Sequence, residues 1–390
     1  MIDFLQEAEQ LFGYTQDLRR DFHRFPEIGF QEYRTAGIVA RELNNLGLEV
    51  TTGVGKTGVV ALLEGEKPGP VALLRFDMDA LPINEETGAE YASQNTGLMH
   101  ACGHDGHTAI GLTVARMLNA HRKDLAGTVK LVFQPAEEGL GGAESMIVDG
   151  VLQNPRPDLT LSLHLWNEAP IGRISVTPGP AMAAADVFRI QVTGKGGHGA
   201  NPHLAVDPVL AAAQIVTALQ SIVARNVSPL KSAVISVTTI HGGEAFNVIP
   251  PVVKMEGTIR TFEPQVRERL LERFYQLIQS IAGGLGCQAH IEILHITPPV
   301  INDVQLSARV GQVTKSVLPE CELATDYRTM GSEDMAFMMQ EIPGCYFFIG
   351  SANSERGLDY SHHHPKFDVD ERALVYGSAL MAAAAADFLK

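Results

Sequence analysis

The chain has 390 residues, of which 45% are hydrophobic and 19% charged, proportions typical of a globular protein long enough for two domains. Its formal net charge of -15 at pH 7 argues against nucleic acid as a partner, because phosphate backbones bind basic surfaces. The first residues lack the basic start and apolar core of a signal peptide, and no apolar run is expected to span a bilayer. We therefore expect a cytoplasmic protein with no membrane partner.

The N-terminal half predicts helices followed by an alternation of strands and helices. Residues 3–48 are expected to form two amphipathic helices, the second over 33–46 and ended by Gly47. Strands and helices then alternate to about Thr177. This rhythm predicts a mostly parallel sheet flanked by helices, the architecture of an α/β domain.

Three expected strands each end in a polar elbow. The strand over 71–76 precedes Asp77 and Asp79, the strand over 128–133 precedes Gln134-Pro135-Ala136-Glu137-Glu138, and the strand over 159–163 precedes His164. In open α/β sheets, ligands gather outside the carboxyl ends of the strands. These carboxylates and imidazoles are therefore expected to converge on one rim.

A further segment, HACGHDGH at 100–107, crowds three imidazoles, a thiol and a carboxylate into eight residues and precedes a helix expected over 108–120. Cys thiolate, His nitrogen and carboxylate oxygen are the ligands of zinc and manganese sites. The alternative is a His-rich loop with a buried cysteine. The four cysteines, Cys102, Cys287, Cys321 and Cys345, contain no CxxC pair, which favours reduced thiols over disulfides.

The pattern changes after Pro178-Gly179-Pro180. The expected order becomes strand, helix, strand, strand, helix, strand, over 187–192, 208–223, 233–240, 253–259, 264–282 and 289–294. This βαββαβ order is typical of a ferredoxin-like sandwich. From about Pro298 the chain returns to helix and strand and ends in an alanine-rich helix over 371–389.

Eight segments distributed over nearly the whole chain resemble one family. They are LRRDFHRFPEIGFQE at 18–32, RFDMDALP at 75–82, HACGHDGH at 100–107, QPAEEG at 134–139, GKGGHGANP at 194–202, FNVIP at 246–250, GSEDMA at 331–336 and HHHPKFDVDE at 362–371. The family is that of the aminoacylase and carboxypeptidase metal-dependent amidohydrolases, in the branch of hippurate hydrolases, N-acyl-amino-acid deacylases and auxin-conjugate hydrolases.

The resemblance implies a two-domain α/β subunit. A zinc-peptidase-like, three-layer catalytic domain would comprise residues 1–183 and 296–390, and an inserted ferredoxin-like α+β lid would comprise 184–295. The family's lid also dimerises, so a homodimer or a higher homo-oligomer is expected.

The resemblance also implies a metal centre. The residues matching the family's metal ligands are Cys102, His104, Glu138, His164 and His363. Glu137 matches the general base, and neighbouring side chains on an extended segment point opposite ways, so one of the two glutamates can bind metal while the other faces water. Asp79 matches a carboxylate that orients a ligand imidazole or the base. The expected cofactor is one or two divalent ions, Mn²⁺ or Zn²⁺, with Co²⁺ or Ni²⁺ as alternatives.

The sequence departs from many relatives at Asp77, where they have histidine, and at Cys102, near which they have a bridging carboxylate. A thiolate is softer than a carboxylate, so the metal identity and the filling of a second site stay open. Asp77 is not expected to be a ligand. The roles of Asp77, His107 and Glu333 are undecided.

Three residues of the expected lid match positions that act on the substrate. His198 matches a histidine that assists the oxyanion, often in the partner's active site, and Asn247 and Arg260 match residues that hold a free carboxylate. For Arg260, a surface salt bridge is the alternative. The expected function is hydrolysis of N-acyl-L-amino acids, hippurate-like or acetylated, with Glu137 as base. The alternatives are a carboxypeptidase or dipeptidase acting on short peptides, and a metal-binding protein without activity.

Overall fold

The computed structural model describes residues 2–390 and divides the chain into two compact units. The first comprises the residues up to Ala181, Ile301–Arg328 and Asp334–Lys390, and the second comprises Met182–Val300 with Thr329–Glu333. Residues 182–183, 296–300 and 329–333, which we predicted in the catalytic domain, therefore cluster with the inserted unit. The lid and dimerisation roles of this unit stay predictions.

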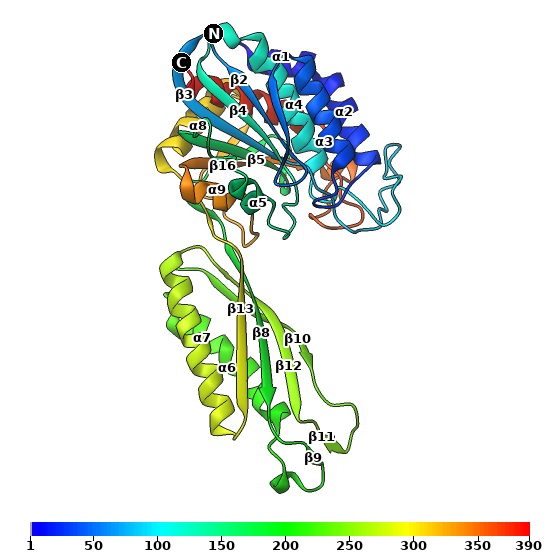
Figure 1. Ribbon diagram of the computed structural model, residues 1–390, viewed down its shortest axis with the longest axis vertical. Coiled ribbons are helices and arrows are strands. Elements are labelled where there is room, and N and C mark those ends of the chain that lie inside the picture. Colours follow the sequence, from blue (N-terminus) through cyan, green and yellow to red (C-terminus); the bar gives the residue numbers. More distant parts are fainter. Residues whose placement is uncertain (1) are drawn as a thin grey trace. The chain divides into compact units, whose positions relative to one another are not determined.

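The first unit is built on an eight-stranded sheet of order β1-β2-β4-β3-β5-β16-β6-β15 (Figure 1). The pairs β3·β4, β3·β5 and β16·β5 are parallel, so the carboxyl ends of these central strands meet at one edge. The strands are β1 Glu49–Val54, β2 Gly58–Glu64, β3 Lys67–Asp77, β4 Ala126–Gln134, β5 Leu159–Pro170, β6 Arg173–Ser175, β15 Glu322–Ala324 and β16 Gly344–Ala352.

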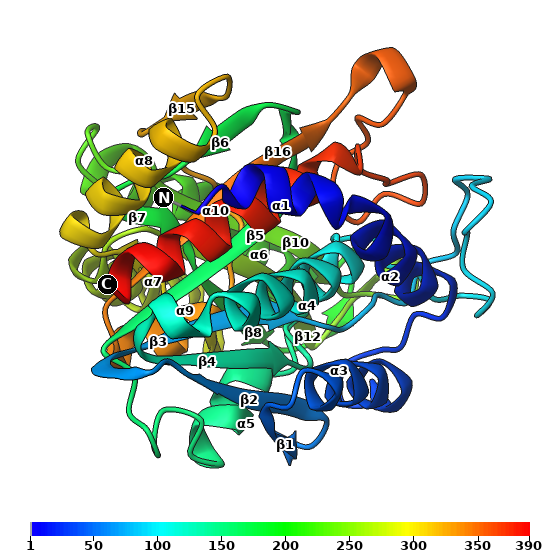
Figure 2. The same cartoon turned by 90° about the horizontal axis from the view of Figure 1, so that it is seen from above.

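Helices cover both faces of this sheet (Figures 1 and 2). On one face α3 Tyr33–Asn45, α4 His104–Ala120 and α10 Arg372–Phe388 contact the strands, with α1 Phe4–Gln10 and α2 Phe12–Arg24 packed outside them and α8 Val304–Val317 beside α10. On the other face lie α5 Gly142–Val148 and α9 Met335–Glu341. The predicted three-layer α/β architecture is confirmed.

Residue alternation along β4 explains why both faces are covered. Val129 and Leu131 belong to the main apolar core, whereas Lys130 between them points to the other face, where its Nζ donates to the carbonyls of Val151 and Gln153 at 2.9 and 2.6 Å. Successive side chains of a strand point to opposite faces, so a strand buried on both sides needs a layer on each.

Three predicted elements differ from the structure. The first predicted helix is divided at Leu11 into α1 and α2. The φ and ψ angles of Leu11, -90° and 1°, are not those of an α-helix, and the weak helix former Gly13 follows. Helix α4 begins at His104 rather than residue 108, because Gly103, at φ +87°, turns the chain into it. Strand β5 continues past His164 to Pro170, because β16 pairs with it, Phe348 opposite His164. His164 therefore lies within a strand and not in an elbow.

The second unit is a four-stranded antiparallel sheet of order β10-β12-β8-β13 packed against two helices (Figure 1). Its elements are β8 Ala184–Thr193, α6 Pro208–Asn226, β10 Ala233–His241, β12 Val252–Thr261, α7 Pro264–Gly284 and β13 Gln288–Thr297. The predicted ferredoxin-like βαββαβ order is confirmed. Strand β9 Gly197–His198 pairs with β11 Val248–Ile249. Short elements elsewhere are β7 Gly179–Met182, β14 Val300–Asn302 and the 3₁₀ helices Arg122–Asp124, Pro202–Leu204 and Ser354–Arg356.

Helix α6 is long and apolar enough, by length and composition, to cross a membrane, which differs from our expectation of no such run. Its residues Ala211, Ile215 and Leu219 are fully buried in the core of the second unit. An apolar helix face of this kind is what packing on a sheet requires. The composition of α6 is therefore accounted for by its place in the fold.

Candidate metal centre

The ligand-type side chains of the first unit gather where several of its elements begin or end. Asp77 and Asp79 close β3, Glu137 and Glu138 follow β4, and His104 opens α4. Ligand sites of open α/β sheets lie at this edge, so the topology itself brings together residues separated along the chain.

All five residues matched to metal ligands lie together, with Glu137 beside them. Within each of three sets, the ligand atoms lie within 4.8 Å of one another; the sets are Cys102, His104 and His164; Cys102, Glu138 and His363; and His104, Glu137 and Glu138. The Sγ atom of Cys102 is 3.6 Å from His164 Nε2, and His363 Nε2 is 3.2 Å from Glu138 Oε1. The mixture of thiol, imidazole and carboxylate is one that divalent transition metals accept.

Two buried atoms of this group make no hydrogen bond: His104 Nε2, and Glu138 Oε1, which has an ion pair with His363 Nε2. A buried polar atom without a partner costs about 1–3 kcal/mol. Both atoms face the other donors of the same group, which is where a cation would satisfy them. The residues of the cluster therefore fit a divalent ion.

Asp79 connects two of these residues. Its main-chain oxygen and its Oδ1 lie 2.9 and 3.2 Å from His104 Nδ1, and its Oδ2 accepts from the N–H group of Glu138 at 3.0 Å. Because both oxygens near His104 Nδ1 are acceptors, Nδ1 carries a proton, and Nε2 is the ring nitrogen left to bind a cation. Asp79 thus orients one ligand-type side chain and the backbone of another.

The thiol of Cys102 is buried, and this burial, followed by the negative charge of Glu138, raises its pKa. The thiol is thus protonated when only protein groups surround it. A coordinated cation favours the thiolate, so metal binding by Cys102 releases a proton.

The elbow that carries Glu137 and Glu138 is held by a residue that sequence analysis did not single out. Ala136 has φ +54°, a left-handed conformation rare for alanine, and its N–H donates to Glu32 Oε1 at 2.9 Å. Glu32 is fully buried and also accepts from Thr57 at 2.5 Å. Glu32 lies in the matched segment at 18–32, and only the folded contact reveals its role.

His363 also has a left-handed backbone, with φ +65°. Its N–H donates to the carbonyl of Ala101 at 2.8 Å, beside Cys102. Non-glycine residues in this region cost of order 1–3 kcal/mol and cluster at functional sites. The conformation brings the imidazole of His363 to Glu138.

Asp77 and His107, whose roles sequence left undecided, bind each other. His107 Nδ1 donates to Asp77 Oδ1 at 2.6 Å, and Arg75 donates to Asp77 Oδ2 at 2.6 Å. Burial raises the pKa of Asp77, but His104, His107 and Arg75 outweigh it and hold this pKa well below its usual range. The other ring nitrogen of His107 accepts from the N–H group of Leu165 at 2.9 Å. Neither nitrogen of His107 is left for a metal.

The residues predicted to act from the lid lie at two ends of the second unit. His198 is exposed in β9 opposite Val248, and Gly199 donates to the carbonyl of Asn247 at 2.7 Å. Arg260 lies near the end of β12, opposite Ala185. Arg260 lies eight residues after the start of β12 at Val252, a distance of about 26 Å along the strand. One copy of this unit therefore does not bring Arg260 together with His198 and Asn247.

The side chain of Arg260 is half-buried, and its Nη1 has no hydrogen-bond partner. Burial lowers its pKa, and Asp186 opposes this. No ion pair of Arg260 is found within residues 2–390, so the alternative of a surface salt bridge gains no support. Glu333 is buried in the second unit, and its role stays open.

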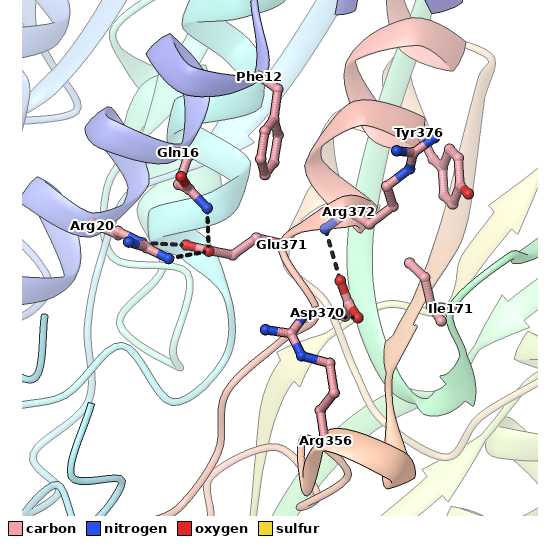
Figure 3. Close-up of a pocket in the computed structure, with 9 residues that line it drawn as sticks. All are labelled: Phe12, Gln16, Arg20, Ile171, Arg356, Asp370, Glu371, Arg372 and Tyr376. Carbon is pink, nitrogen blue, oxygen red and sulfur yellow. Dashed lines mark hydrogen bonds and ion pairs between the residues drawn. The ribbon is translucent and has the colours of Figure 1, made fainter. Parts of the chain in front are cut away.

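A surface cavity of about 570 Å³ in the first unit provides a contrast (Figure 3). Its wall carries three arginines and two carboxylates, all paired: Arg20 with Glu371 at 2.6 Å, Arg356 with Asp370 at 3.2 Å and Arg372 with Glu9 at 2.9 Å. No predicted ligand lines it. Each charged residue of its wall thus already has an ion-pair partner.

Comparisons with known proteins show similarity to one family. The family model described as Peptidase family M20/M25/M40 matches residues 73–387. Thermostable carboxypeptidase 1 of Saccharolobus solfataricus is 39% identical over 98% of this chain and 97% of its own length. N-acetyl-L-cysteine deacetylase of Bacillus subtilis is 38% identical over 95% of this chain and 86% of its own.

A solved structure shows the same similarity in three dimensions. The YXEP protein of Bacillus subtilis, described as a dinuclear metal binding peptidase from the M20 family, aligns with a TM-score of 0.85. It is 35% identical and the alignment covers 98% of this chain and 99% of that chain.

Proposed function

The chain belongs to peptidase family M20/M25/M40 and is a metal-dependent hydrolase, and we propose that it cleaves the amide bond of N-acyl-L-amino acids. The substrates we propose are acetylated and hippurate-like compounds with a free carboxylate. The deacetylase relative is named for an N-acyl amino acid, whereas the carboxypeptidase relative is named for peptides.

The observation that supports this proposal most directly is the donor cluster, in which the buried His104 Nε2 has no hydrogen-bond partner and Glu138 Oε1 makes an ion pair with His363 but no hydrogen bond. We propose that Cys102, His104, Glu138, His164 and His363 hold one or two divalent ions, Mn²⁺ or Zn²⁺ before Co²⁺ or Ni²⁺. A bound ion supplies Lewis acidity, which lowers the pKa of water and polarises an amide carbonyl.

The remaining chemistry belongs to the protein's own side chains. Glu137, half-buried beside His104 and Glu138, takes a proton from the attacking water and delivers it to the departing amine nitrogen. Asp79 keeps His104 in the tautomer that presents Nε2. These two roles need a carboxylate at each position, since an amide at Glu137 cannot accept the proton.

Substrate binding is assigned to the inserted unit. We propose that Arg260, with its unpartnered buried Nη1, binds the free carboxylate of the amino acid, and that Asn247 and His198 act in the active site of a partner subunit. The roughly 26 Å between the two ends of β12 supports this division, because a small substrate cannot touch both ends of one copy.

A homodimer formed by the inserted unit follows from this division. The unit exposes Phe246 completely, Leu210 by 51% and Val248 by 52%. Strand β10 lies at the edge of its sheet, where its outer backbone groups have no strand partner among the described residues. We propose that a second copy covers these surfaces, and light scattering that gives the mass of a single chain would contradict this.

The substrate class is tested by removing and restoring metal. The purified protein is stripped with a chelator, given Mn²⁺, Zn²⁺ or Co²⁺ singly, and assayed for amino-acid release from hippurate, N-acetyl-methionine and an unblocked dipeptide. We expect amino-acid release from the acylated compounds, and we expect it to depend on the added ion. Both relatives described above are named for the hydrolysis of amide bonds.

Each other outcome has a defined meaning. Cleavage of the dipeptide alone would replace the deacylase by the carboxypeptidase or dipeptidase alternative. Tight retention of metal with no turnover on a wider acyl panel would contradict the proposed activity and favour a protein that only binds metal. Equal activity of the stripped protein would contradict the metal centre itself.

A further inference from the structure

The backbone N–H and carbonyl groups of Leu165 lie among three histidine side chains of the first unit. Its N–H donates to His107 Nε2 at 2.9 Å, and its carbonyl oxygen accepts from His164 Nδ1 at 2.7 Å and from His362 Nε2 at 3.0 Å. Leu165 itself is fully buried. Both backbone polar groups of Leu165, which belong to two successive peptide units, are therefore bound by imidazoles.

These contacts define the protonation of each ring. A carbonyl oxygen only accepts, so His164 carries its proton on Nδ1 and His362 on Nε2. The N–H of Leu165 only donates, so Nε2 of His107 is unprotonated and its proton is on Nδ1, which donates to Asp77. Nε2 of His164 is thus left with its lone pair, 3.6 Å from the thiol of Cys102.

The side chain of Leu165, like its backbone, lies against the start of α4. A β-carbon added at Gly106 would lie 2.5 Å from Leu165 Cδ1, closer than real β-carbons approach other atoms. At Gly103 an added β-carbon would lie 3.5 Å from Leu165 Cβ, and the φ of +87° there favours glycine in any case. The two glycines of HACGHDGH thus let the strand that carries His164 approach the turn that carries Cys102 and His104.

His362 connects Leu165 to the loop at 361–367, which also carries His363. Its ring is 4.5 Å from the ring of Trp166 and 5.0 Å from that of Phe367. It immediately precedes His363, whose left-handed backbone needs support from its neighbours. The hydrogen bond to Leu165 fixes the ring between these aromatic side chains.

We propose that His107 and His362 are positioning residues of the metal centre, which act through the backbone N–H and carbonyl groups of Leu165. They join three of the four segments that carry the proposed ligands: the start of α4, strand β5 and the loop at 361–367. We do not assign either residue as a ligand, since His107 has both nitrogens occupied and His362, whose Nε2–H donates to a carbonyl, belongs to none of the candidate ligand groups among the described residues. The inference rests on the ligand set proposed above.

A matched pair of variants tests the role of His362. His362→Phe keeps a ring between Trp166 and Phe367 but has no donor for Leu165, whereas His362→Gln keeps a donor at a similar distance along the side chain. His364→Phe is the control, because His364 lies in the same loop but is exposed and stacks on Tyr360. Circular dichroism confirms that each variant is folded.

The readout is binding of Co²⁺ to the stripped full-length protein, followed by the visible absorption bands of the bound ion. We expect His362→Phe to weaken binding about 10–100-fold and to shift the bands, the range seen when residues that orient metal ligands are lost. His362→Gln should recover most of the affinity and the wild-type bands. His364→Phe should match the wild type.

The same comparison at His107 uses His107→Gln, which offers an acceptor to Leu165 and a donor to Asp77, and His107→Leu, which offers neither. Two results would overturn the inference. The first is Co²⁺ affinity and spectra in His362→Phe and His107→Leu that match the wild type. The second is an equal loss of Co²⁺ affinity in each of these variants and in the glutamine variant at the same position. If the wild-type protein binds no Co²⁺, the proposed ligand set fails and this inference fails with it.

Discussion

His104 and Asp105 are neighbours at the start of α4, yet they belong to two buried regions with opposite properties. His104 faces the donor cluster, where its Nε2 has no hydrogen-bond partner. Asp105 accepts from Arg19 Nε at 2.8 Å and lies 2.7 Å from His23 Nδ1. Arg19 continues the second network to Asp368 at 2.6 Å and Glu371 at 3.2 Å.

We call the residues Arg19, His23, Asp105, Asp368 and Glu371 the ionic network. Glu371 extends it to the wall of the cavity in Figure 3. Both regions are rich in charge, and only the unpartnered atoms distinguish the donor cluster from the ionic network. The difference teaches that function should be sought where buried donors and acceptors are left unsatisfied, because partnered charges already serve stability.

The largest effect expected from this comparison is on turnover. Glu137→Gln replaces the proposed proton acceptor by an amide of the same shape, and general-base removal typically costs about 10²–10⁴-fold in rate. We expect a loss of about 10³-fold in kcat on N-acetyl-methionine, with the metal content unchanged by mass spectrometry. A variant with wild-type kcat would remove Glu137 from the mechanism.

The next effect is on stability and concerns the ionic network. Arg19→Met removes the cation shared by three buried carboxylates and leaves Asp368 without an ion-pair partner among residues 2–390, and loss of one partner of a buried pair typically costs about 3–5 kcal/mol. Urea unfolding of the metal-free protein measures this loss. A change below about 1 kcal/mol would show that the network is not a stabilising one.

The pH dependence of stability sharpens the same contrast. Burial lowers the pKa of His23, but the hydrogen bond and charge of Asp105 and the bond to Glu85 outweigh it and raise this pKa to about 9. Because the folded pKa exceeds the unfolded value of about 6.5, the stabilisation is complete below pH 6.5 and is lost as pH rises to about 9.

The size of this loss is roughly 3 kcal/mol, since each pKa unit corresponds to about 1.4 kcal/mol. Urea unfolding of the metal-free protein between pH 6 and 9.5 measures it, and His23→Gln is the reference that lacks the group. Wild-type and His23→Gln curves with the same slope over this interval would contradict the raised pKa.

The smallest stability effect is expected in the donor cluster. Glu138→Gln removes a charge whose one ion pair is with the exposed imidazole of His363, and exposed ion pairs contribute little, so the metal-free protein should lose less than about 1 kcal/mol. The stabilisation given by added Zn²⁺ should disappear in the same variant. A loss as large as that of Arg19→Met in the metal-free protein would erase the distinction between the two regions.

The cluster could be predicted from sequence where its donors lie in short segments. Cys102 and His104 share one motif, and Glu138 follows a recognisable strand. The two domains could also be predicted, because the spacing of strands and helices changes at the insertion. Local pattern is enough in these cases, since neighbouring residues on one element share its geometry.

Contacts between distant segments could not be predicted. The bond from Ala136 to Glu32 joins residues 104 positions apart, and that from Arg19 to Glu371 joins residues 352 apart. Strand β5 extends beyond its polar residue His164 because β16 pairs with it, and the chain around His164 gives no sign of that partner. Tertiary pairing decides these features, and local propensity does not.

The most direct test of the donor cluster is a calorimetric titration of the stripped protein with Zn²⁺, comparing His104→Asn with Asp105→Asn. We expect the wild type to bind one or two ions per chain, His104→Asn to bind about 100-fold or more weakly, and Asp105→Asn to remain within about 10-fold of the wild type. Wild-type affinity in His104→Asn, or equal losses in both variants, would contradict a metal centre built on the unpartnered donors.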